Sequence, residues 1–211
     1  MSKGGNVKCI HTIRIRRPIR TAVAVFAVVA VPAGAVAVPA LAGPSGTAAS
    51  ASALTGTVAG CPAGWGSLPE ASTFQGSGHL TNVRTGRHAC FDRIVFDIDG
   101  KPSWLRVHYV KDIASVAEGK LIPVRGGAKL EIILLVPSND ETNHYTYNPA
   151  NYDELTNVSG YRTFRQVVGA GSFEGETTIG LGVRARLPFR VFTLAGPGTT
   201  SRVVVDVAHG W

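Results

Sequence analysis

The sequence predicts an all-β fold, a small antiparallel β-sandwich, preceded by a signal peptide and a flexible linker. The clearest pattern lies near the C-terminus, where Val203, Val205 and Val207 alternate onto one face of a strand. The segment Gly196-Pro197-Gly198 interrupts any continuous strand and supplies the turn between this strand and the one that begins at residue 188. These residues together predict a hairpin.

A second observation is that one strand pattern occurs twice. The order Arg, three apolar residues, Asp and one apolar residue is found at 93–98 and again at 202–207. Repetition of a strand in this form is typical of an antiparallel β domain, and it suggests that the two segments are equivalent strands of that domain.

Residues 1–42 have the composition of an export signal. An apolar run at 22–31 is followed by the small-x-small cleavage site Ala40-Leu41-Ala42. An uncleaved membrane anchor is the alternative, but the run is shorter than the roughly 20 apolar residues that a spanning helix needs. We therefore expect the signal to be removed. The basic residues that precede the apolar run are Lys3, Lys8, Arg14, Arg16, Arg17 and Arg20.

The charge of the chain depends on this signal. The chain has 21 basic and 14 acidic residues, a formal net charge of +7. Without the six basic residues of the signal, 15 basic residues face 14 acidic ones, which leaves +1. The mature protein therefore lacks the basic excess typical of nucleic-acid or membrane-surface binding, and we predict neither.

Residues 43–77 form a low-complexity linker and the segment that leads into the domain. The part from 43 to 60 has no charged residue and few large apolar ones, which indicates a flexible linker. Cys61 and Cys90 remain after the signal with Cys9 is lost, and an even cysteine number in an exported chain predicts a Cys61–Cys90 disulfide. The letters at 58–61 also fit a lipobox, so lipid anchoring at Cys61 is an alternative that excludes the disulfide.

Residues 78–211 are enough for one β domain with a single core. The segment 130–136 is apolar on both faces apart from Glu131, which predicts a central strand covered on both sides. The segment 161–170 fits a helix or a strand equally well. Alternation predicts the remaining strands before the closing hairpin at 79–85, 91–98, 104–110 and 177–187.

The strand at 177–187 supplies the first candidate binding site. Gly180 and Gly182 would leave its outward face flat, so that a ligand could approach the backbone. Arg184 and Arg186 on the same face could hold a carboxylate or phosphate of a wall polymer. The alternative is a solvated strand face whose arginines pair with cross-strand partners such as Glu174 or Glu176.

A second candidate lies in the long polar segment 137–157. Tyr145, Tyr147 and several asparagines there are suitable for contact with a sugar, although they are also ordinary loop residues. Trp65 could likewise stack on a sugar, or it could cover the edge of the core near the disulfide.

The sequence contains no recognisable catalytic apparatus. It has no nucleophile elbow, His-Glu-x-x-His zinc motif, phosphate-binding loop or dinucleotide fingerprint. We accordingly predict no catalytic residue, no metal site and no cofactor.

Four segments together resemble the AMIN-like domain of secreted proteins and lipoproteins of actinobacteria. They are 82–88, 91–97, 172–182 and the closing hairpin 188–207. The family is distantly similar to the AMIN domain of cell-wall amidases, a small β-sandwich. The resemblance implies a binding or envelope-localisation module with no known active site. Together with the export signal, it predicts a secreted, non-catalytic module of the cell envelope that binds peptidoglycan or an associated polymer, and we expect a monomer. The alternative is a module that docks on an envelope protein through a sheet edge or the tyrosine-rich loop.

Overall fold

The computed structural model describes residues 60–211, and the predicted signal peptide and most of the linker lie outside them. The described part consists of strands and connecting loops, and it contains no helix long and apolar enough to cross a membrane. The strands are β1 (Glu70–Thr73), β2 (Leu80–Arg87), β3 (Phe91–Ile98), β4 (Trp104–Val110), β5 (Ile113–Ala114), β6 (Leu121–Ile122), β7 (Ala128–Leu134), β8 (Phe164–Phe173), β9 (Glu176–Val183), β10 (Phe189–Ala195) and β11 (Ser201–Ala208).

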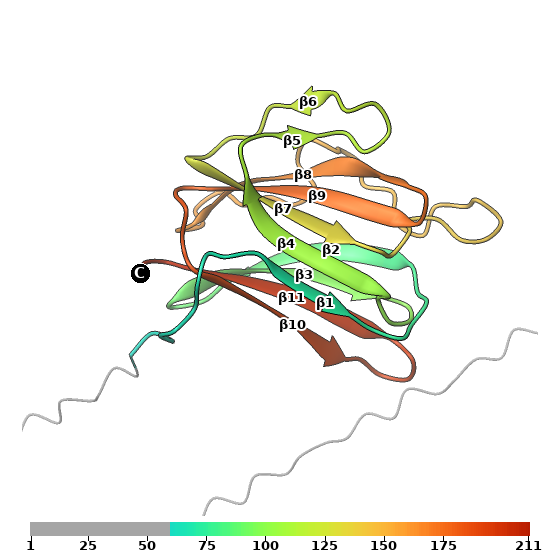
Figure 1. The fold of residues 1–211 in the computed structure, drawn as a ribbon, viewed down its shortest axis with the longest axis horizontal. Coiled ribbons are helices and arrows are strands. Elements are labelled where there is room, and N and C mark those ends of the chain that lie inside the picture. Colours follow the sequence, from blue (N-terminus) through green and yellow to red (C-terminus); the bar gives the residue numbers. More distant parts are fainter. Residues whose placement is uncertain (1–59) are drawn as a thin grey trace, which may run out of the picture. The chain divides into compact units, whose positions relative to one another are not determined.

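Two antiparallel sheets pack face to face (Figure 1). One has the strand order β1-β4-β7-β9-β8, the other has the order β10-β11-β3-β2, and the short pair β5-β6 forms a separate ribbon. The predicted all-β sandwich is confirmed. Its core lies between the sheets and includes the fully buried side chains Phe96, Phe164, Phe189, Leu105, Leu130, Ile132 and Ile179.

The alternation of valines in the sequence is the direct cause of this packing. Val203, Val205 and Val207 of β11 are fully buried, as are Ile94 and Phe96 of the neighbouring β3. Successive side chains of a strand point to opposite faces, so one apolar set from each strand faces the other sheet. Burial of this surface, at roughly 25 cal/mol per Å², is the main force that holds the two sheets together.

The repeated strand pattern is explained by the register of β3 and β11. These strands are adjacent and antiparallel, and Arg93 lies opposite Asp206 while Asp97 lies opposite Arg202. Two copies of one pattern in antiparallel register therefore place an arginine of each strand across from an aspartate of the other. The two segments that the sequence suggested as equivalent strands are therefore paired with each other.

Asp206 is the best-shielded charge in this arrangement. Its side chain is fully buried, and its two carboxylate oxygens accept hydrogen bonds from Arg93 at 2.6 and 2.8 Å and from Arg190 at 2.9 Å. The Arg190 guanidinium also lies 4.4 Å from the centre of the Trp65 ring. Trp65 thus covers an arginine on the outer side of the four-stranded sheet and contacts Phe91, with ring centroids 5.6 Å apart.

The structure decides two points that the sequence had left open or placed wrongly. The segment that fitted either a helix or a strand is β8, which is paired along β9. β7 is central, as predicted, but the prediction that both its faces are covered is wrong. Its inward face is buried, whereas Ile133 on the other face is only half-buried and the following Leu135 is 40% exposed.

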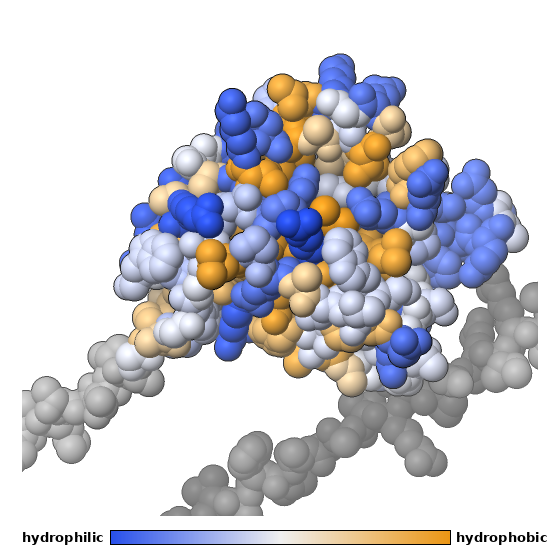
Figure 2. Space-filling view, in the orientation of Figure 1, coloured by the Kyte–Doolittle hydropathy of each residue, from blue (hydrophilic) through white to orange (hydrophobic). Residues whose placement is uncertain are grey.

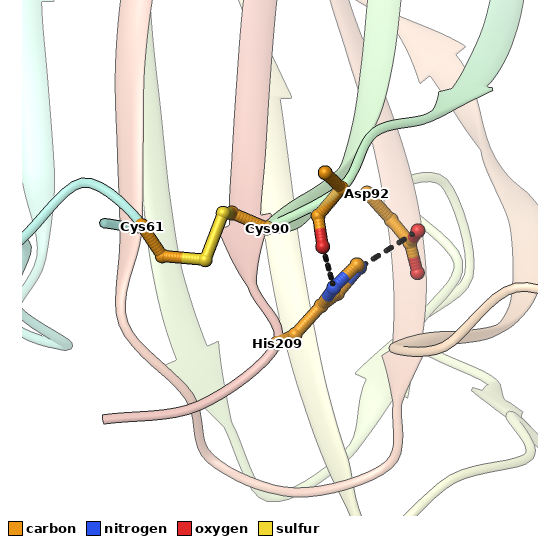
Figure 3. Close-up of a disulfide and its surroundings, with 5 residues drawn as sticks. Cys61, Cys90, Asp92 and His209 are labelled. Carbon is orange, nitrogen blue, oxygen red and sulfur yellow. Dashed lines mark hydrogen bonds and ion pairs between the residues drawn. A yellow bond between two sulfur atoms is a disulfide. The ribbon is translucent and has the colours of Figure 1, made fainter. Parts of the chain in front are cut away.

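The predicted disulfide joins Cys61 to Cys90, with the two Cα atoms 5.3 Å apart (Figure 3). It fixes the segment that leads into the domain to the start of β3. The sulfur of Cys61 is consumed in this bond and cannot carry a lipid at the same time.

Removal of the disulfide should destabilise the domain. The bond closes a loop with a sequence separation of 29, and the chain-entropy model gives about 3.6 kcal/mol for a loop of this size. We expect a double Cys61→Ala, Cys90→Ala variant to lose about that much unfolding free energy in urea titration. Reduced wild-type protein serves as the control and should be as stable as the variant. Equal stability of the oxidised wild type, the reduced wild type and the variant would contradict the disulfide assignment.

The two aspartates of the repeated pattern should differ in importance. Asp206→Asn removes the charge that two arginines share in a buried position, and we expect a loss of about 3 kcal/mol of unfolding free energy. Asp97→Asn alters a pair with Arg84, whose side chain is 48% exposed, so its loss should stay below about 1 kcal/mol. Chemical denaturation of both variants tests this; similar losses would be inconsistent with a special role for Asp206.

Candidate functional site

The tyrosine-rich segment between β7 and β8 is folded onto the protein by a compact turn. Asn139 and Tyr145 form a β-bridge, and the Asp140 carboxylate accepts hydrogen bonds from the Thr142 hydroxyl at 2.7 Å and from the amides of Thr142 and His144 at 2.9 Å. The Thr142 hydroxyl and the His144 amide lower the pKa of Asp140. The turn therefore carries a fixed negative charge.

The second half of this segment lies along the edge of β8. The amide of Leu155 donates to the carbonyl of Val167 at 2.8 Å, and the amide of Gly169 donates to the carbonyl of Tyr152 at 2.7 Å. A side chain at position 169 would collide with the Tyr152 ring, because a Cβ atom there would lie 2.8 Å from that ring. Glycine at this position is what allows Tyr152 to lie flat against the strand.

Tyr145, Tyr147 and Tyr152 meet around one cavity of about 310 Å³, which we call the tyrosine hollow. Its walls also include Asn139 and Asn143, hydroxyl-bearing residues of β8 and β9, and the apolar Leu155 and Ile179. Tyr145 is 68% exposed and Tyr152 is 44% exposed, so both rings present apolar surface to solvent. The hollow thus combines aromatic faces with amide donors and acceptors.

Tyr147 is the most deeply placed of the three tyrosines. It packs against the main core, and burial, with a smaller contribution from neighbouring Tyr152, raises its pKa to about 12. Its phenol therefore stays neutral at physiological pH.

A larger cavity of about 840 Å³ adjoins the tyrosine hollow and shares Asn139, Asn143 and Ser172 with it. We call this second cavity the acidic hollow. His79 is the one basic side chain among the described residues that line it, and it lies 3.1 Å from an oxygen of Asp99 and 3.4 Å from an oxygen of Glu141. The carboxylates that line it are Asp99, Asp140, Glu141 and Glu174.

The glycine face predicted as a binding surface is not open. Gly180 and Gly182 are buried. A side chain at Gly180 would meet Ile113 of β5, and one at Gly182 would meet the carbonyl of Arg125. The prediction that a ligand could approach the backbone here is wrong, because the chain's own segment 113–125 occupies that position.

The two predicted arginines contact parts of the chain other than the tyrosine hollow. Arg184 donates to the carbonyl of His209, and Arg186 donates to the carbonyl of Ser67 at 2.8 Å. Arg186 also lies over the Tyr109 ring at 4.9 Å. Both follow the end of β9, whereas the hollow is lined by the start of that strand. The structure thus brings Tyr145 and Tyr147 together and leaves the glycines and arginines elsewhere.

A buried pair that sequence reasoning missed joins the C-terminal segment to β3 (Figure 3). His209 Nε2 lies 3.2 Å from Asp92 Oδ1, and the other oxygen of the buried Asp92 accepts hydrogen bonds from the amides of Thr163 and Phe164. His209 Nδ1 lies 3.2 Å from the carbonyl of Ala89. Both ring nitrogens are engaged, so this histidine has none left to activate a nucleophile, and the pair serves to anchor the chain end.

Nothing in the sequence pointed to this pair, because the two residues are 117 positions apart. The tyrosine hollow was partly visible, since Tyr145 and Tyr147 are close in sequence, but Gly169 and Ser172 join it only through the fold. Within residues 60–211, no group of three or more His, Cys, Asp or Glu residues has the arrangement of a metal site.

Comparison with known proteins identifies one family. The model of the AMIN-like domain matches residues 78–209, which include both sheets except β1. No curated protein and no solved structure matches the chain.

Tyr147 gives the site a measurable titration. Burial raises its pKa to about 12, compared with roughly 10 for an unfolded tyrosine. The folded state then binds the proton more tightly, so the stability due to this group is present below about pH 10 and is lost as pH rises through about 12. In ultraviolet titration, the difference between wild type and Tyr147→Phe should show a phenol that ionises near pH 12; ionisation near pH 10 would contradict the buried placement.

Proposed function

This chain belongs to the AMIN-like domain family, and from that membership we propose that it is a non-catalytic module of the cell envelope that binds a wall polymer in the tyrosine hollow. The observation that supports the hollow as the site is the meeting of three tyrosine rings and two asparagine amides around one cavity. Binding pockets commonly combine aromatic walls with a few well-placed polar groups.

The chemistry of the tyrosine hollow fits a sugar ring. A pyranose has apolar C–H faces, which would lie against the exposed rings of Tyr145 and Tyr152. Its hydroxyl groups both donate and accept hydrogen bonds, as do the amides of Asn139 and Asn143. Because Tyr147 keeps its proton, its hydroxyl would remain a donor to such a ligand.

The charge around the site narrows the class of polymer. Four carboxylates line the acidic hollow against one histidine, and the pKa of Asp140 is lowered, which keeps that carboxylate ionised. A negatively charged ligand at this site would be repelled by these carboxylates. We infer that the bound segment is a glycan without negative charge and not a phosphate-rich polymer. Any amino group that it carries would be directed toward the acidic hollow.

The compartment agrees with this function. Structural disulfides persist in oxidising surroundings outside the cytoplasm, and the Cys61–Cys90 bond ties the start of the described domain to β3. The family and the disulfide therefore support an extracytoplasmic location. Secretion through cleavage of residues 1–42 remains part of the proposal.

A second candidate function is docking of an envelope protein. The observation that favours it is a second groove beside β10, which shares no lining residue with the tyrosine hollow. The two functions use different surfaces and can be tested separately.

Binding to purified peptidoglycan sacculi should depend on the exposed tyrosines. We expect Tyr145→Ala and Tyr152→Ala each to weaken co-sedimentation about fivefold, because loss of one aromatic contact is worth about 1 kcal/mol. Trp211→Ala is the matched control, since Trp211 is 81% exposed and lies outside the hollow. Its binding should equal that of wild type.

Two results would oppose the proposal. Wild-type protein that stays in the supernatant at every salt concentration and pH would exclude polymer binding. Equal weakening by the tyrosine variants and by Trp211→Ala would place the binding surface outside the tyrosine hollow.

A further inference from the structure

One edge of the four-stranded sheet is only half occupied. β10 is the edge strand, and its first residues are paired by the chain itself. The amide of Phe189 donates to the carbonyl of Gly66 at 2.8 Å, and the amide of Val191 donates to the Glu70 carboxylate at 3.0 Å. The chain then leaves this edge at Glu70 to form β1 of the other sheet.

In the second half of the edge, two backbone amides lack partners within the described part of the chain, whereas the carbonyl of Ala195 accepts a hydrogen bond from the Arg202 guanidinium at 2.9 Å. Amides of an edge strand alternate between its two sides, so those of Thr193 and Ala195 point away from β11, as those of Phe189 and Val191 do. Neither amide has a hydrogen-bond partner among residues 60–211. The β8 edge of the five-stranded sheet differs, because segment 152–155 forms hydrogen bonds along it.

The inner face of β10 is also uncovered at this end. Phe189 is fully buried and Val191 is partly buried, but Thr193 and Ala195, which share their face, are exposed. Side chains on the inner face of a sandwich normally pack against the opposite sheet. A cavity lies beside these side chains, and no described residue fills it.

The result is a groove of about 660 Å³, which we call the β10 groove. Phe74 and the buried Pro102 form its apolar floor, and Thr193 to Ala195 form one wall. Figure 2 shows mostly pale and orange spheres over the region where β1 and β10 lie in Figure 1. The surface is therefore largely apolar or weakly polar.

Lys101 is the single charged residue that lines this groove in the described part of the chain. The remaining polar groups are hydroxyls, chiefly of Thr199, Thr200 and Ser201. A complementary ligand would carry one negative charge, placed at Lys101, and be otherwise uncharged, because the groove shares Ser77, Gly100 and Thr199 with the acidic hollow.

We propose that the β10 groove binds an extended peptide of a partner protein, with a single acidic group, by strand addition. The peptide backbone pairs with Thr193 and Ala195, and one apolar side chain enters the space above Phe74. An acidic side chain or a terminal carboxylate pairs with Lys101. Main-chain pairing at a free sheet edge combined with a side-chain pocket is a recurrent mode of peptide recognition. The peptide continues the line that segment 66–70 begins along the same edge.

A second copy of the chain fits the groove less well. The bound segment 66–70 covers the first half of each β10 edge, so two copies would share only a short stretch around Thr193 to Ala195. Two-fold pairing of that stretch would also bring two Lys101 side chains toward each other, and like charges in such an interface are unfavourable.

The test uses the protein without residues 1–42 and a phage-displayed library of decapeptides that alternate apolar and polar residues. Selected peptides are synthesised with a fluorophore and titrated by polarisation. We expect enrichment of sequences with an acidic residue near one end. N-methylation of the amides on one side of the peptide should abolish binding, whereas methylation of the alternate amides should leave it unchanged.

Variants of the groove should separate its contributions. Thr193→Pro removes the free amide and leaves the ladder with β11 intact, and it should weaken binding at least tenfold. Thr193→Ala keeps the amide and should bind within twofold of wild type. Lys101→Glu alters an exposed side chain and should weaken binding of acidic peptides at least tenfold even if the proline variant folds poorly. Sacculus binding should be unchanged in the Lys101 variant.

Three results would overturn the proposal. One is that no peptide is enriched above background. Another is that the Thr193→Pro and Lys101→Glu variants, shown to be folded by near-ultraviolet circular dichroism, bind selected peptides as wild type does. The third is a dimer in sedimentation velocity that Thr193→Pro dissociates, since the edge would then be taken by a second copy.

Discussion

The rest of the structure depends on the antiparallel pairing of β3 with β11. This pair lies in the middle of the four-stranded sheet, and its buried valines and isoleucines form one wall of the core. A slip of one residue would turn that apolar set toward solvent and would separate Arg93 from Asp206. Burial and charge pairing therefore specify the same register. The disulfide and the Asp92–His209 pair then attach both ends of the described chain to the same β3 end.

The two proposed binding surfaces lie at places that this scaffold leaves incomplete. In the tyrosine hollow, a long connection covers the edge of β8 but leaves a cavity beneath its aromatic rings. In the β10 groove, the last residues of the strand are exposed and border a cavity. Loops and free edges are where a rigid β-sandwich can expose specific chemistry without loss of its core. One surface is proposed for a sugar and the other for a peptide, and together the two proposals describe a module that connects a wall polymer to a protein.

The glycines and arginines predicted as a binding site instead contact other parts of the same chain. Gly180 and Gly182 do provide a flat strand face, and the sequence argument about close approach was physically sound. The partner that approaches is Arg125 together with Ile113 of the β5–β6 ribbon. Arg184 and Arg186 do bind carbonyl oxygens, those of His209 and Ser67. Flat faces and exposed arginines indicate that something is bound, and they do not tell whether it is foreign or internal.

The sequence by itself determined the fold class, the strands from β2 to β4, the closing hairpin and the disulfide, because each of these follows from local alternation, turn residues or the count of cysteines. It also indicated Tyr145 and Tyr147 as neighbours. Only the tertiary structure decided that β8 is a strand, that Asp92 and Asp206 are buried and paired, and that the predicted glycine face is covered. The same holds for the half-free edge of β10. These features join residues far apart in the chain, and periodicity within one strand contains no information about which segment will pack on its outer face.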